Sequence, residues 1–93
     1  MNDFSIYCIE ETEYKWIFEV GLDNYRYIVD LDKGYFANLA DKGTSPEVLI
    51  RASFEFLLER EPASSILSNF ELSIIQNYFP EYEDMMRNKL KSR

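Results

Sequence analysis

Carboxylates are the only plentiful side chains in this sequence that suggest catalytic or metal-binding chemistry. Asp30 and Asp32 flank Leu31 at the end of a predicted strand, and residues two apart point to the same side of a strand. Two such groups could hold Mg²⁺ and support a metal-dependent enzyme. The competing interpretation makes Asp30 a solvated surface residue and Asp32 the cap of the following helix. We favour the second interpretation.

Other residue types exclude several classes of enzyme. The chain contains no histidine, so Ser-His and Cys-His nucleophiles and zinc sites with imidazole ligands are impossible within it. The three glycines, Gly21, Gly34 and Gly43, are isolated, so the chain contains neither a phosphate-binding loop nor a dinucleotide fingerprint. We therefore expect no cofactor, and we expect the protein not to be an enzyme.

Cysteine usage and hydropathy predict a soluble, cytoplasmic protein. Cys8 is the single cysteine, which rules out an intramolecular disulfide and fits a reducing compartment. We expect Cys8 to be a small buried hydrophobic residue. The N-terminus lacks the pattern of a signal peptide, and no window approaches ~18 continuous apolar residues. We therefore expect no association with a membrane.

Charge is distributed unevenly along the chain. All 17 Asp and Glu residues precede residue 85, and such an acidic body repels nucleic-acid phosphate. We therefore do not expect nucleic acid as a partner. The last seven residues hold four basic residues: Arg87, Lys89, Lys91 and Arg93. They follow Glu81, Glu83 and Asp84 in a predicted helix over residues 80–90, and this order of charges favours the helix dipole.

Residues 4–31 predict three antiparallel strands, at about 4–9, 14–22 and 25–31, because apolar residues alternate with a period of two. A two-residue turn at Asp23-Asn24 would place Val20 opposite Tyr27, Phe18 opposite Val29 and Trp16 opposite Leu31. These six side chains then share one face, and the opposite face is mostly polar. The sheet is therefore predicted to bury one face only.

The first hairpin has two possible registers. A loop at residues 11–13 places Cys8 opposite Trp16 and keeps Tyr7 and Ile9 on the outer face. A two-residue loop would turn Tyr7 and Ile9 inward. We favour the longer loop.

Helices are predicted at about residues 33–40, 46–60, 71–79 and 80–90. Asp32 can cap the first helix and Ser45 the second, with Pro46 at its first position. Charged residues recur every fourth position of the second helix, and the apolar residues cover too wide an arc for a one-sided surface helix. This helix is therefore expected between the sheet and the later helices. The chain is predicted to be a single α+β domain over residues 1–93.

Three segments carry a resemblance to known proteins. They are Ser53-Phe54-Glu55-Phe56-Leu57-Leu58-Glu59-Arg60-Glu61-Pro62, Ser65-Ile66-Leu67 and Tyr78-Phe79-Pro80-Glu81-Tyr82. In these segments the chain resembles a family of small uncharacterised bacterial proteins that share the SFxFLLEREP and YFPEY segments. The resemblance implies a shared core and brings no activity with it.

A second similarity, to antitoxins of the HicB type, rests on the order of three strands followed by a helix. It implies a regulator that binds a partner protein. The chain lacks the glycine-containing loop that usually precedes that helix, and it shows no DNA-binding segment.

The main functional hypothesis is a non-enzymatic interaction or accessory protein, acting as a homodimer or with an unidentified protein partner. It rests on the outer face of the predicted sheet, where Tyr7, Ile9, Ile17 and Ile28 form an apolar patch. Four charged residues frame this patch: Lys15, Glu19, Arg26 and Asp30.

Overall fold

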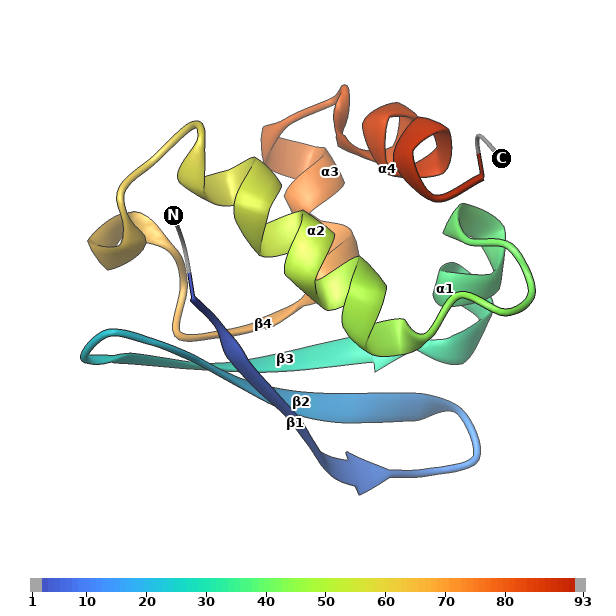
Figure 1. Ribbon diagram of the computed structural model, residues 1–93, viewed down its shortest axis with the longest axis horizontal. Helices are drawn as coiled ribbons and strands as arrows, with labels where there is room; N and C mark the ends of the chain where they lie inside the picture. The colour runs from blue at the N-terminus through green and yellow to red at the C-terminus, as the bar shows by residue number, and fades with distance from the viewer. Residues whose placement is uncertain (1–2, 92–93) are drawn as a thin grey trace.

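The computed structural model describes residues 3–91, which form one four-stranded sheet with all the helices on one of its faces (Figure 1). The strand order is β1-β2-β3-β4. The predicted α+β fold is confirmed. The elements are β1 (Ser5–Glu11), β2 (Lys15–Leu22), β3 (Tyr25–Asp32), α1 (Lys33–Leu39), α2 (Pro46–Leu58), β4 (Asn69–Glu71), α3 (Ile75–Tyr78) and α4 (Tyr82–Lys91), with short 3₁₀ turns at Ala63–Ser65 and Leu72–Ile74.

The β2–β3 hairpin has the predicted register. Val20 pairs with Tyr27, Phe18 with Val29 and Trp16 with Leu31. The turn lies between these strands at residues 23–24, where Asp23 takes a left-handed conformation with φ of 55°, which aspartate tolerates better than most residues. Alternation of apolar and polar residues, together with this turn, therefore specifies the register.

The β1–β2 hairpin differs from the prediction by two residues. Cys8 lies opposite Phe18 instead of Trp16, and a β-bulge at Ile9 then pairs Glu10 with Ile17. The predicted outer position of Tyr7 is kept, because a shift by two residues preserves the face. The predicted burial of Cys8 is wrong: the thiol is exposed. Side-chain burial falls along the strand after the buried Phe4, so the helices cover only the first part of β1.

The predicted helix at about residues 71–79 is present over residues 72–78, but it begins with a 3₁₀ turn and a strand precedes it. Residues 69–71 form β4, which pairs in parallel with β3, and a 3₁₀ turn leads into the four-residue α3. The backbone N–H of Ile28 donates to the carbonyl of Ser68 at 2.8 Å. The open edge of β3 thus provides hydrogen-bond partners for the backbone of the segment just before these helical turns. Leu72 and Ile75 are still buried, as their apolar spacing indicated.

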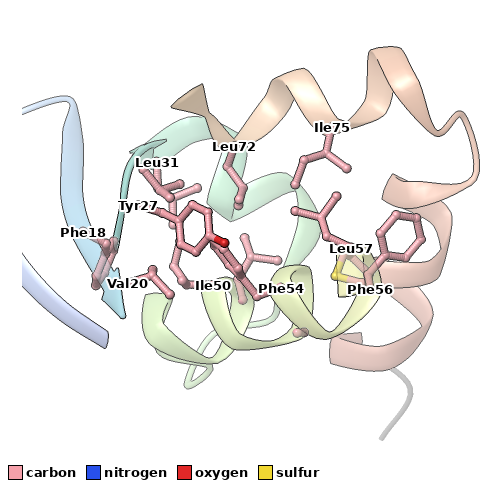
Figure 2. Close-up of a cluster of buried hydrophobic side chains, with 14 of the residues drawn as sticks. Phe18, Val20, Tyr27, Leu31, Ile50, Phe54, Phe56, Leu57, Leu72 and Ile75 are labelled. Atoms are coloured by element: carbon pink, nitrogen blue, oxygen red, sulfur yellow. The ribbon is translucent and has the colours of Figure 1, made fainter. Parts of the chain in front are cut away.

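The central helix α2 packs on both the sheet and the later helices, as predicted, and Figure 2 shows its Phe54 beside Tyr27 of the sheet and its Leu57 beside Ile75 of α3. The Phe54 ring packs on Tyr27 of the sheet, with 5.1 Å between centroids. The Phe56 ring packs on Phe79 at 5.7 Å and on Tyr82 at 5.2 Å. The charged row of α2 is turned away from this core. The apolar Val48 is 46% exposed and departs from the expected burial.

A buried pair of hydroxyls joins α2 to α4. Ser53 Oγ donates to the carbonyl of Leu49 at 2.7 Å, and Tyr82 Oη donates to Ser53 Oγ at 2.6 Å. Both side chains are fully buried, and burial raises the pKa of Tyr82 well above its usual value. The pair satisfies two polar groups that would be costly to bury alone.

Arg60 makes a second connection between the same two regions. Its guanidinium carbon lies 3.6 Å from the centroid of the Phe56 ring, and its Nε lies 3.2 Å from Glu81 Oε2. Nη1 donates to the Phe56 carbonyl at 3.0 Å and so caps the end of α2. Two of the segments that carry the first resemblance, residues 53–62 and 78–82, therefore pack directly on each other.

Basic residues of α4 attach it to α1. Arg87 and Lys91 each donate to the carbonyl of Asn38, at 3.4 Å in both cases, near the C-terminal end of α1. Tyr35 Oη donates to Glu83 Oε2 at 2.9 Å. Two of the four basic residues near the C-terminus, Arg87 and Lys91, are thus engaged in packing, while Arg93 lies outside the described residues. No helix within residues 3–91 is long and apolar enough to cross a membrane.

Candidate functional site: the outer sheet face

The candidate site is the face of the sheet that carries no helix, which we call the outer sheet face. One row of paired residues across it is Tyr7, Glu19, Ile28 and Asn69; the next is Glu10, Ile17, Asp30 and Glu71. Paired residues in neighbouring strands point to the same side. Three of the predicted interface residues, Tyr7, Ile17 and Ile28, therefore lie on this face. The fourth, Ile9, is unpaired in the bulge of β1 between Cys8 and Glu10.

Exposure differs across these four side chains. Tyr7 is 63% exposed and Ile9 is 52% exposed, both on the edge strand β1. Ile17 and Ile28 are half-buried in the interior strands. Ile17 is diagonal to both Tyr7 and Ile28, a separation that large side chains span. The most exposed of these side chains therefore lie at the open edge of the sheet.

Ion pairs lie on either side of the patch. Lys15 Nζ is 2.9 Å from Asp30 Oδ2, and Arg26 Nε is 3.5 Å from Glu19 Oε2. The hydrogen bond to Asp30, with the charge of the same carboxylate, raises the pKa of Lys15. Such exposed pairs add little stability. They fix where charge of each sign lies around the apolar side chains.

Two further acidic residues belong to this face and were missed at the sequence level. Glu10 and Glu71 lie in the same row as Ile17 and Asp30, and neither makes an ion pair among residues 3–91. Glu71 reaches the face only because β4 joins the sheet, and Glu10 only because of the bulge. The alternation of residues within one strand predicts neither event.

Asp30 and Asp32 have different roles, as the favoured interpretation expected. Asp30 lies on the outer sheet face against Lys15, whereas Asp32 Oδ1 accepts a hydrogen bond from the backbone N–H of Tyr35 at 2.9 Å and caps α1. Both carboxylates are therefore engaged by protein groups. In the part of the chain that the structure describes, no cluster of three or more His, Cys, Asp or Glu residues is placed to hold a metal ion.

The outer sheet face combines exposed apolar side chains with charges of both signs. Its side chains are suited to contact with another surface, through apolar burial at the centre and ion pairs at the rim.

Comparison with family models, with curated proteins and with solved structures finds no match. The two resemblances drawn from the sequence therefore stay predictions.

Proposed function

We propose that this protein is a small non-enzymatic interaction domain that binds another protein through its outer sheet face. The observation that carries the proposal is the set of apolar side chains Tyr7, Ile17 and Ile28 on a face without helices, with Ile9 in the adjoining bulge. Two of these four side chains are more than half exposed. Clustered apolar side chains with a polar rim are typical of protein interaction sites.

The open edge of β1 supports the same proposal. β1 has seven residues and forms one edge of the sheet. An uncovered edge strand presents unpaired backbone groups to a partner. The bulge near its end limits how far a straight strand can pair there, which favours contact through the face over extended strand addition.

A second copy of the chain is the first candidate partner. The outer sheet face holds two cations, Lys15 and Arg26, each in an ion pair within the chain. It also holds two carboxylates, Glu10 and Glu71, and neither carboxylate makes an ion pair among residues 3–91. Two copies could therefore exchange ion pairs around the apolar patch. The single, exposed Cys8 fits a reducing compartment such as the cytoplasm.

Sedimentation velocity tests the self-associating form of this function. We expect the wild type to dimerise at micromolar concentration and an Ile17→Glu, Ile28→Glu double variant to stay monomeric, because four carboxylates would then enter the apolar centre of the dimer. The matched control is Ser64→Glu with Asn88→Glu, which adds the same charge at exposed positions away from the sheet. A wild type that is monomeric up to high micromolar concentration would reject self-association.

Binding to a different protein is tested by affinity capture from the source cell with the same variants. The partner would be a protein that both the wild type and the Ser64→Glu, Asn88→Glu control retain. The Ile17→Glu, Ile28→Glu variant should not retain it. Equal retention by all three forms would assign the binding to another surface.

A further inference from the structure

An apolar pocket of about 200 Å³ opens in the helical layer, away from the outer sheet face. It lies where the end of α2, the segment leading through β4, and α3 meet. Its apolar lining includes Leu57, Ile66, Phe70, Ile75 and Phe79, and Glu61 contributes a carboxylate. We call it the Glu61 pocket. Four of these apolar residues are buried members of the core, so the floor of the pocket is part of the folded interior.

The size and rim of the Glu61 pocket indicate what it can hold. Sites for small molecules usually measure about 300–1,000 Å³, so this pocket is better matched to one inserted side chain. Leu67 is 50% exposed and Tyr78 is 64% exposed, and both also line the pocket. Exposed aromatic and aliphatic side chains around an apolar pocket are typical of the anchor points in protein interfaces.

The charge around the pocket is negative. Glu61 is half-buried and makes no ion pair among residues 3–91, whereas its neighbours Glu59 and Glu81 both lie against Arg60. Arg60 itself is therefore already shared between two carboxylates. The whole chain carries a net charge of −7, which attracts cationic partners and repels acidic ones.

We propose that the Glu61 pocket binds a segment of another protein that inserts one large apolar side chain and places a lysine or arginine beside it. The apolar side chain would bury against Phe70 and Ile75, and the cation would pair with Glu61. This site is separate from the outer sheet face. Variants of the pocket leave Tyr7, Ile17 and Ile28 unchanged, so the two proposals succeed or fail independently.

Selection from a random dodecapeptide display library on the intact protein tests the proposal. We expect enriched peptides to share a Leu, Ile, Phe or Trp with Lys or Arg within three positions of it. Synthetic copies should bind Glu61→Gln about tenfold more weakly than the wild type, because glutamine can still accept a hydrogen bond from the peptide cation but has no charge to pair with it. The matched control Glu59→Gln, at the same end of α2 but outside the pocket, should bind like the wild type.

A second variant tests the apolar part of the pocket. Ser65 lines it, and Ser65→Phe should fill the space and abolish binding, whereas Ser64→Phe next to it should not. Backbone amide shifts on titration should then cluster at Leu57, Ile75 and Tyr78. Any of three results would overturn the proposal. They are a selection that enriches no peptide, enriched peptides that lack the apolar and basic pair, and peptides that bind Glu61→Gln as tightly as the wild type. If Ser65→Phe does not fold, the Glu61→Gln result decides alone.

Discussion

Replacement of Phe56 by alanine tests the placement of α2 between the sheet and the later helices. Phe56 is 3% exposed, and its ring is enclosed by the rings of Phe79 and Tyr82 and by the guanidinium of Arg60. Deletion of the ring removes these contacts together and leaves a cavity that the surrounding helices can only partly fill.

The expected cost follows from these contacts. Phe→Ala substitutions in a core cost about 3–5 kcal/mol, and we expect the upper part of this range because two aromatic pairs and a cation–π contact are lost as well. Phe56→Leu keeps most of the apolar burial and should lose mainly the aromatic pairs, at about 0.5–1.5 kcal/mol each. Since domains of this kind are stable by about 5–15 kcal/mol, the alanine variant should fold but be fragile.

Urea unfolding followed by circular dichroism measures both variants. With an m-value of about 1–3 kcal/mol/M, a loss of about 4 kcal/mol lowers the urea midpoint by roughly 1–4 M. Val48→Ala is the control on the same helix, since Val48 is 46% exposed and should cost less than about 0.5 kcal/mol. A Phe56→Ala cost as small as that of Val48→Ala would show that α2 faces a different way.

Three further measurements test other parts of the structure. Asp32→Ala should lower the free energy of unfolding by about 1 kcal/mol because it removes the N-cap of α1, and urea unfolding that shows no loss would contradict the capping role. Burial raises the pKa of Tyr82 above its ordinary value, so the folded state holds this proton more tightly than the unfolded state. Stability should therefore be full below about pH 10 and fall above it. The fall in urea midpoint between neutral and alkaline pH should be smaller in Tyr82→Phe, and an identical fall in both proteins would refute the assignment. Cys8 is exposed, so a thiol reagent should label it at the same rate in native buffer and in urea, whereas strong protection in native buffer would restore the burial first expected.

The parts of the fold that could be predicted depend on local patterns. Alternation along β2 and β3, with a two-residue turn, is enough to set their register. The apolar arc of α2 required cover on most sides, and Asp32 stood where a helix cap is needed. Each of these features depends on residues near one another in the sequence.

The parts that could not be predicted depend on residues far apart in the sequence. β4 is three residues long and exists because β3 offers a free edge, about forty positions earlier in the chain. The bulge at Ile9 changes the pairing of β1 without changing its composition. In the candidate site, the patch of Tyr7, Ile17 and Ile28 followed from the period of two, whereas Glu71 and the Glu61 pocket depend on the chain returning to the sheet.

Amide chemical shifts followed by NMR over a concentration series test the central claim in its self-associating form, that two copies of the chain bind each other through the outer sheet face. On going from low to high micromolar protein, shifts should change at Tyr7, Ile9, Ile17 and Ile28 and stay constant along α1 and α4. The Ile17→Glu, Ile28→Glu variant should show no such changes. Constant shifts across the sheet at every concentration, or changes confined to the helices, would contradict self-association through this face.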